Sequence, residues 1–162
     1  MKTRLSQILA VAIVSLIGVL SANAQQMNLS GFVYAGDTLG ESKTLKVKTG
    51  LKSKNGQFVA VMQEDGNFCL YKINNGGGGD FIQCTMTSSA DVSKKGNGAW
   101  MSNDGSLKIV TNRSAVLWSS NTGTGDDNSK KGRFMVLQDD GSLIIFGRDN
   151  KSKIYDFKKG RM

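Results

Sequence analysis

Short apolar runs alternate with polar, glycine-containing turns along most of this chain, and three of the turns contain the pair Asp-Gly. Glycine accepts a positive φ angle without steric cost, so Asp-Gly between two apolar runs is a turn signal. The runs are rich in β-branched and aromatic residues, which favour strands. They precede the turns at residues 58–62, 99–101 and 134–137, and follow them at 68–71, 107–110 and 143–146. This pattern predicts three β-hairpins.

The three hairpins form an internal repeat. Their turn aspartates are residues 65, 104 and 140, which are 39 and 36 residues apart. A further apolar run follows each hairpin, and Gln83, Trp118 and Tyr155 take equivalent places in these runs. A unit of three or four short strands cannot bury its apolar face alone, so we expect three units to pack around a common axis in an all-β fold. The glycines at 76–79 are expected to lengthen the first hairpin loop and to make it mobile.

The first 24 residues differ from the rest of the chain. Lys2 and Arg4 precede an apolar run at residues 8–20, and an Ala-x-Ala pattern ends at Ala24. This is the layout of a secretory signal peptide. The apolar run is shorter than the roughly 20 residues that span a bilayer as a helix, and a retained membrane anchor is the alternative. We therefore expect a leader at 1–24 and one domain at 25–162, with its core at about 32–157. The mature protein would be extracellular, or periplasmic in a bacterium.

The mature segment carries a positive net charge. Removing Lys2 and Arg4 from the 21 basic residues leaves 19 against 13 acidic residues, a net charge of +6. A positive net charge favours binding to anionic surfaces, including nucleic acid or acidic glycans. The basic residues are scattered, however, except for a cluster at 158–161. We interpret them as solvated faces and predict neither a nucleic-acid partner nor a membrane span.

The composition removes most enzyme classes. The chain contains no histidine. This excludes Ser-His-Asp and Cys-His catalysis and the commonest metal ligand. No acid/base pair is visible, and the glycine run lacks the lysine and spacing of a phosphate loop. We predict a protein that is not an enzyme and needs neither cofactor nor metal.

A row of polar side chains crosses the first Asp-Gly turn. Alternate residues of a strand face the same side, so Gln63, Asp65, Asn67, Cys69 and Tyr71 are expected to line one face. The residues between them, such as Met62, Phe68 and Leu70, would face the core. Carboxylate, amide and phenol groups together donate to and accept from the vicinal hydroxyls of a pyranose. The alternative is an ordinary solvent-exposed face of a strand.

The spacing Gln-x-Asp-x-Asn-x-x-x-Tyr resembles the mannose-site motif of the monocot bulb lectins, in which a valine stands at the position of Cys69. The segments at 36–39, 51–58 and 117–122 are also similar to that family, so the resemblance covers about residues 32–157. It implies a β-prism II fold of three four-stranded antiparallel sheets with pseudo-threefold symmetry, and up to one metal-free sugar site per sheet. It also implies that Asp65 and Asn67 hold the axial O2 of mannose, Gln63 its O3 and Tyr71 its O4.

The motif is degenerate in the other two units. The second unit keeps only Asp104, and Lys108 would push a charged side chain into the sugar platform, so we expect no site there. The third unit keeps two motif residues and changes two, which predicts at most a weak second sugar site at Gln138, Asp140, Ser142 and Phe146.

The presence of two cysteines in a chain that is expected to be exported indicates a disulfide. If Tyr71 pairs with Ile82 across the hairpin, Cys69 lies opposite Cys84 on the same face, within reach of a bridge. A one-residue slip of the register would separate them. Two free thiols are the alternative. A bridge would lie beside or within the sugar platform, where it either replaces the valine contact or blocks the site.

These observations predict a secreted lectin for mannose-containing glycans. A shallow site implies monovalent affinity near millimolar, about −4 kcal/mol. Useful avidity would then require clustering or a homo-oligomer. The main alternative is a β-prism scaffold that has lost sugar binding and contacts a protein or an envelope surface. A third hypothesis is an antimicrobial lectin that resembles the tandem bulb-lectin bacteriocins. Those proteins carry two such domains, however, and this chain has room for one.

Overall fold

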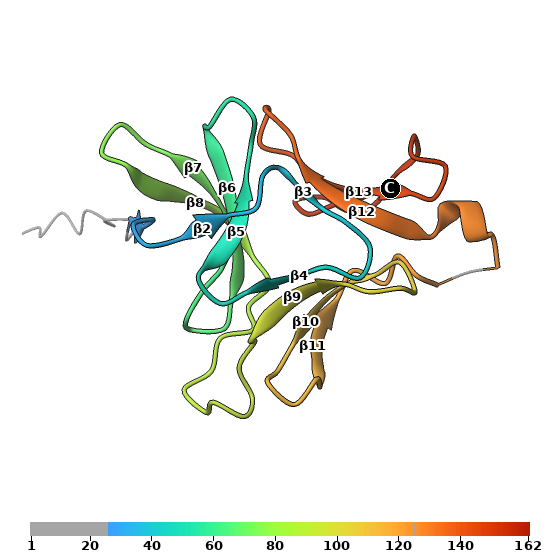
Figure 1. The fold of residues 1–162 in the computed structure, drawn as a ribbon, viewed down its shortest axis with the longest axis horizontal. Helices are drawn as coiled ribbons and strands as arrows, with labels where there is room; N and C mark the ends of the chain where they lie inside the picture. The colour runs from blue at the N-terminus through green and yellow to red at the C-terminus, as the bar shows by residue number, and fades with distance from the viewer. Residues whose placement is uncertain (1–25, 125) are drawn as a thin grey trace, which may run out of the picture.

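The computed structural model describes residues 26–124 and 126–162, and Figure 1 shows three β-sheets around a common centre. The predicted leader lies outside the described residues. In spatial order, the first sheet consists of β1 (Met27–Asn28), β8 (Gly78–Cys84), β7 (Phe68–Ile73), β6 (Phe58–Met62), β5 (Thr49–Lys52) and β2 (Val33–Tyr34). The second consists of β11 (Val116–Ser119), β10 (Leu107–Val110), β9 (Gly98–Met101) and β4 (Thr44–Lys46). The third consists of β15 (Gly160–Arg161), β14 (Lys153–Asp156), β13 (Leu143–Gly147), β12 (Gly132–Leu137) and β3 (Thr38–Leu39).

Each sheet contains the expected core of four antiparallel strands, so the predicted β-prism is confirmed. Two sheets are larger than predicted. The strands β1 and β2 flank the first core and β15 flanks the third, because open sheet edges offer unpaired backbone groups to an added strand. The strand β2 runs parallel to β5, so the first sheet is not wholly antiparallel.

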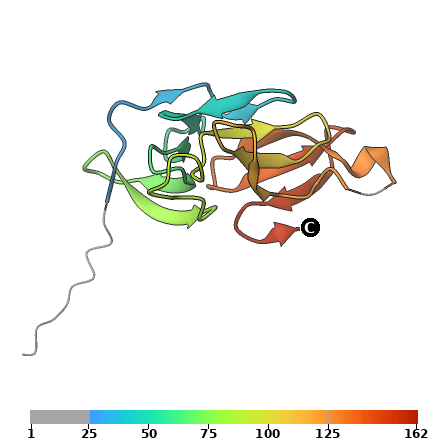
Figure 2. The same ribbon diagram turned by 90° about the horizontal axis from the view of Figure 1, so that it is seen from below.

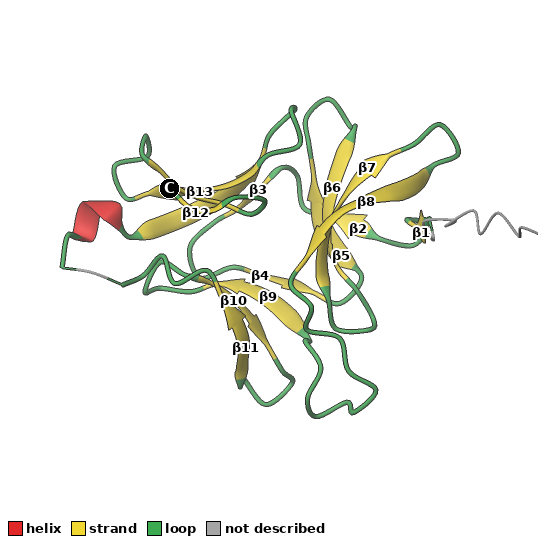
Figure 3. Ribbon diagram, turned by 180° about the vertical axis from the view of Figure 1, so that it is seen from behind, coloured by secondary structure: helices red, strands yellow, loops and turns green. Residues whose placement is uncertain are grey.

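One continuous segment ties the three sheets together. The consecutive strands β3, β4 and β5 join the third, the second and the first sheet respectively (Figure 1). Each hairpin unit therefore obtains its fourth strand from this shared segment. In the described part of the chain one short 3-10 helix, η1 (Asn128–Lys130), precedes β12 (Figure 3), and no helix there has the length and apolar character to span a membrane.

The core fills the space between the inner faces of the three sheets. Figure 2 shows the arrangement of these sheets from below. It is built from the apolar residues that alternate inward along the hairpin strands. Phe157 makes two edge-to-face contacts in this core, with ring centroids 5.7 Å from Phe68 and 5.9 Å from Trp118. The largest fully buried side chains come from all three units and include Leu51, Met62, Phe68, Leu70, Met101, Leu107, Ile109, Met135, Leu137, Leu143 and Ile145.

The repeat extends to a β-bulge at the same place in every unit. The equivalence of Gln83, Trp118 and Tyr155 is confirmed by their partners, which are Leu70, Ile109 and Ile145. Directly after each of these pairs the register shifts by one residue, because the outer strand carries one extra residue. The extra residues are Ile82, Leu117 and Ile154. The predicted pairing of Tyr71 with Ile82 is therefore wrong, and Tyr71 pairs with Phe81.

The glycine run at 76–79 is only partly a loop. Gly78 and Gly79 begin β8, so the first hairpin turn is shorter than expected. The side-chain oxygen of Asn74 accepts hydrogen bonds from the amides of Gly76 at 3.1 Å and Gly78 at 3.0 Å. The turn is thus closed by its own hydrogen bonds.

Glycine–glycine contacts join successive units. A Cβ atom on Gly105, in the second Asp-Gly turn, would lie 2.5 Å from the carbonyl oxygen of Gly132. A Cβ on Gly66, in the first turn, would lie 2.7 Å from the amide nitrogen of Gly96. The Thr122 hydroxyl donates to the Gly105 carbonyl at 2.6 Å and fixes this approach. The turn glycines therefore serve packing between units as well as turn geometry.

Candidate functional site

The predicted polar row lies on the outer surface of the first sheet, away from the core. Gln63 follows the end of β6, Asp65 lies in the Asp-Gly turn, Asn67 precedes β7, and Tyr71 lies within β7. All four side chains line one open depression. The structure thus brings together the residues that the motif selected, although their exposure differs widely along the row.

Asp65 and Asn67 form the accessible end of the row. The Asn67 side-chain Nδ2 donates to Asp65 Oδ2 at 3.1 Å, and the Asn67 backbone amide donates to Asp65 Oδ1 at 2.9 Å. The Asn67 Oδ1 atom is used internally, because it accepts from the amides of Thr87 at 2.7 Å and Ser88 at 3.1 Å. Asp65 Oδ2 and the second N–H of Asn67 Nδ2 therefore lie side by side. One hydroxyl group can donate to the former and accept from the latter.

Gln63 and Tyr71 form the covered end of the row, and each is only 6% exposed. Gln63 Nε2 donates to Tyr71 Oη at 2.7 Å and also lies 3.2 Å from the sulfur of Met27. Burial raises the pKa of Tyr71, against the opposing effect of the Gln63 hydrogen bond. Both N–H groups of the Gln63 amide are thus engaged within the protein. Gln63 and Tyr71, which the resemblance assigns to O3 and O4 of mannose, are therefore hydrogen-bonded to each other, and the Gln63 amide also contacts Met27.

Cys69 and Cys84 form a disulfide between β7 and β8, and they are direct partners in the register. The predicted bridge is confirmed, and the alternative of two free thiols is wrong. The bulge that displaces Ile82 lies beyond the cysteine pair, so it does not separate the two cysteines. Cys69 is fully buried, and its sulfur lies 3.1 Å from Gln63 Oε1. This sulfur carries no proton, so the approach is a packing contact that encloses the Gln63 amide.

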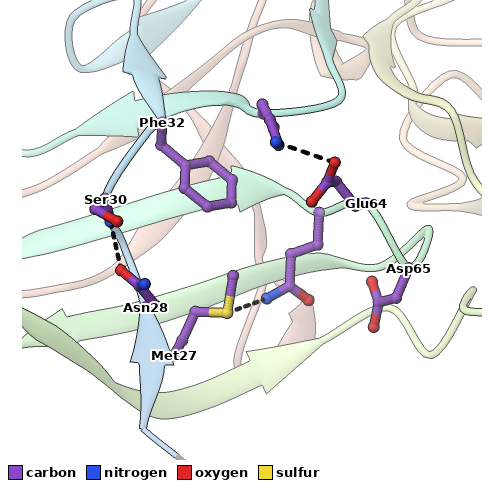
Figure 4. Close-up of a pocket in the computed structure, with 8 residues that line it drawn as sticks. Met27, Asn28, Ser30, Phe32, Glu64 and Asp65 are labelled. Carbon is purple, nitrogen blue, oxygen red and sulfur yellow. Dashed lines mark hydrogen bonds and ion pairs between the residues drawn. The ribbon is translucent and has the colours of Figure 1, made fainter.

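Two open depressions of about 610 and 410 Å³ adjoin this site, and Met27, Asn28, Gln63 and Asp65 line both. Figure 4 shows the smaller one, with the Met27 sulfur directed toward the Gln63 amide and Asp65 on the far side of that amide. The larger one also exposes two apolar side chains, Phe81 and Met86, which are 58% and 81% exposed. A few polar groups beside apolar walls are typical of ligand sites, and this mixture suits a pyranose, which has hydroxyl edges and C–H faces.

The corresponding row of the second unit is occupied by its own side chains. Ser102 and Ser106 are buried, and Lys108 forms an ion pair with Asp104 while lying 5.6 Å from the centre of the Trp100 ring. Burial opposes the ionisation of Asp104. Hydrogen bonds from Lys108, Ser102 and the Ser106 amide outweigh it and lower the pKa of this carboxyl to about 2. The one acidic motif residue of this unit is therefore already paired with a cation.

The third row keeps an exposed carboxylate without the neighbouring amide. Asp140 Oδ1 accepts from the backbone amide of Ser142 at 2.8 Å, which lowers the pKa of Asp140. Phe146 stacks on Phe134 with ring centroids 5.4 Å apart. Gln138 is half-buried beside the turn. This unit thus offers a carboxylate but lacks the amide group that Asn67 places beside it in the first unit.

The described residues contain no group of three or more acidic, cysteine or histidine side chains placed to hold a metal ion.

No family model matches the sequence. The chain is 29% identical over 97 residues to the mannose-specific lectin of Aloe arborescens, across 57% of this chain and 74% of that lectin. Among solved structures it is similar to the monomeric mannose-binding lectins of Gastrodia elata, with 26% identity, a TM-score of 0.59, and coverage of 76% and 98% of the two chains. It is also similar to the snowdrop (Galanthus nivalis) mannose-specific agglutinin in complex with methyl α-D-mannoside, with 29% identity, a TM-score of 0.55, and coverage of 72% and 94%.

The predicted resemblance to the bulb-type lectin family is thus confirmed in sequence and in fold. Sequence reasoning missed three contributors to the site, Met27, Phe81 and Met86. The segment containing Met27 precedes the region of resemblance, although its alternation of Met27 and Leu29 with Asn28 and Ser30 is a short strand pattern. Phe81 was missed because the bulge, which strand periodicity does not reveal, places it opposite Tyr71.

Proposed function

We propose that this protein is an exported, non-catalytic lectin of the bulb type that binds mannose-containing glycans on the outer surface of the first sheet, without a metal ion. The observation that carries the proposal is the pair Asp65–Asn67, which presents one acceptor and one donor 3.1 Å apart at the accessible end of the motif. Such a pair satisfies a sugar hydroxyl in both of its hydrogen-bonding roles. The exposed Phe81 and Met86 supply apolar surface for the C–H face of the ring.

The affinity of a single chain should be weak. One accessible donor–acceptor pair on an open surface supports a dissociation constant near millimolar, about −4 kcal/mol. Self-association or a clustered glycan would raise the avidity without any new contact. Because no step of this recognition needs a metal, a chelator should leave binding unchanged.

The role of Asp65 as a ligand must be separated from its role in the turn, where its Oδ1 accepts the Asn67 amide. Asp65→Asn keeps an oxygen for the turn and removes the negative second acceptor, whereas Asp65→Ala removes both. Asp140→Asn is the matched control, because Asp140 makes the same turn contact in the third unit. Binding of each purified variant to methyl α-D-mannoside and to mannose-rich glycans should be measured by calorimetry and on a glycan array.

The expected result is loss of binding in Asp65→Asn with an unchanged urea unfolding midpoint, while Asp140→Asn binds like the parent. Loss in Asp140→Asn alone would move the site to the third sheet. Binding that survives both substitutions would contradict the assignment of the site to these turns. A mass corresponding to residues 25–162 in the exported chain is the expected sign of leader cleavage.

The burial of Gln63, Cys69 and Tyr71 favours a second candidate function. Three of the five row positions are covered, and the other two units have degenerate rows. A β-prism scaffold that contacts a protein or cell surface fits these facts. A glycan array without signal, from a protein that unfolds in one sharp transition, would support the scaffold.

A further inference from the structure

The segment that begins the described structure lies over one end of the motif. Its strand β1 pairs with the edge of β8, with Met27 opposite Gly79 and Asn28 opposite Gly78. The glycines make this docking possible. A Cβ on Gly79 would lie 2.9 Å from Cβ of Tyr71, and a Cβ on Gly78 would lie 3.4 Å from the carbonyl oxygen of Met27. The glycine-rich start of β8 therefore admits both the Tyr71 side chain and the added strand.

Two side chains of this segment bury the motif. Leu29 is 7% exposed and packs in an apolar cluster with Val59, Val61, Cys69 and Tyr71 on the outer face of the first sheet. Met27 packs at the edge of the same cluster and places its sulfur 3.2 Å from Gln63 Nε2 (Figure 4). This cluster is separate from the prism core, which lies on the other face of the sheet.

The contact of Met27 has a chemical consequence for the row. An amide nitrogen has two N–H groups, and on Gln63 they are directed to Tyr71 Oη and to the Met27 sulfur. A thioether is a weak acceptor, so a sugar hydroxyl is a better partner for that N–H. Met27 therefore occupies the position from which a ligand hydroxyl would accept from Gln63.

We propose that residues 26–30, here called the N-terminal cover, fill the Gln63–Tyr71 half of the glycan site and compete with the ligand for it. Met27 then determines specificity: with the cover in place, recognition is restricted to Asp65 and Asn67, and its departure opens the complete row. The proposal rests on the proposed glycan-binding function. The cover is anchored by a two-residue strand and one buried leucine, so it can be displaced without unfolding the prism.

The test uses the full mature chain with substitutions that loosen the cover. Met27→Ala removes the sulfur from the row, and Leu29→Asn removes the apolar anchor. Val33→Ser is the control, because Val33 follows the cover in β2 and is 68% exposed. Binding of methyl α-D-mannoside is measured by calorimetry, and the methionine methyl groups are followed by NMR, with Met27→Ala assigning the Met27 signal.

If the cover is closed about nine-tenths of the time and the closed form binds sugar much more weakly than the open form, loss of the cover tightens binding about tenfold, since the apparent dissociation constant then scales inversely with the open fraction. The expected result is about tenfold tighter binding in both cover variants, unchanged binding in Val33→Ser, and a shift of the Met27 methyl signal when the parent chain binds sugar. Equal or weaker binding in the cover variants, with the parent still binding, would overturn the cover and leave the proposed function standing. Absence of binding in every form would overturn the proposed function itself.

Discussion

Replacing Gly105 by alanine should destabilise the prism through two separable effects. The first is backbone strain, because Gly105 has φ = 95°, and the left-handed region costs an L-residue about 1–2 kcal/mol. The second is a clash, because the new Cβ would lie 2.5 Å from the oxygen and 2.7 Å from the nitrogen of Gly132. These are backbone atoms that cannot rotate away, and forced overpacking typically costs about 1–3 kcal/mol. Together we expect a loss of about 3 kcal/mol in the free energy of unfolding.

Two other glycines isolate each effect. Gly36 has φ = 86° with nothing within 4 Å of its would-be Cβ, so Gly36→Ala tests strain alone and should cost about 1 kcal/mol. Gly132 lies outside the positive-φ region, but its Cβ would lie 2.1 Å from the Gly105 oxygen. Gly132→Ala therefore tests the clash alone and should cost about 2 kcal/mol.

The free energies come from urea unfolding followed by tryptophan fluorescence, since Trp100 and Trp118 both lie in the second sheet, whose turn between β9 and β10 contains Gly105. The order of loss should be Gly105 first, Gly132 second and Gly36 last, with equal m-values. Equal losses in Gly36→Ala and Gly105→Ala would refute the reasoning, because the glycine–glycine contact between units would then contribute nothing.

Two further predictions concern the disulfide and the second turn. Replacing both Cys69 and Cys84 by serine should lower the free energy of unfolding by about 3 kcal/mol, because the bridge closes a loop with a sequence separation of 15; a double variant with the parent's urea midpoint would contradict this. Asp104→Asn should destabilise by less than about 1 kcal/mol at pH 7, since the carboxyl is about half exposed. The pKa of Asp104 is lowered from 3.8 to about 2 in the fold, so the stability gained from its ionised form is complete above pH 4 and is lost as the pH falls toward 2. Urea midpoints of the two proteins should therefore converge across that interval, and a gap independent of pH would assign the effect to something other than ionisation.

The three-unit prism could be predicted because its signals are local and repeated. Each Asp-Gly turn has a glycine at positive φ, and each hairpin buries alternate residues. The bridge between Cys69 and Cys84 followed from the presence of two cysteines in a chain expected to be exported, together with an assumed hairpin register. The bulges could not be predicted, because an extra residue on one strand leaves the apolar alternation of the other strand unchanged. The prediction that Cys69 lies opposite Cys84 was correct only because the register shift at Ile82 comes after this pair along β7 and leaves the pair in register.

The added strands escaped prediction for a different reason. A two-residue strand such as β1 is too short to establish a period, and its position depends on the edge of β8, more than 50 residues away in the sequence. The same limit applies to β3, β4 and β5, which one segment delivers to three different sheets. The burial of Gln63 and Tyr71 under Met27 is thus a tertiary effect that the motif spacing does not contain.

The turn aspartate itself does not distinguish a sugar site from a structural turn. In all three units its Oδ1 accepts the backbone amide two residues later, at 2.9, 2.8 and 2.8 Å. The turn alone therefore accounts for an aspartate in every unit, including the one where Lys108 pairs with Asp104. What differs is the second carboxylate oxygen and the residue after the glycine. In the first unit the residue after the glycine, Asn67, places an amide N–H beside that oxygen. The other units have serine at this position, and in the second unit the ammonium group of Lys108 binds the second oxygen of Asp104 instead. The amide is thus the informative member of the motif, and a row that keeps aspartate but loses asparagine should be interpreted first as a turn.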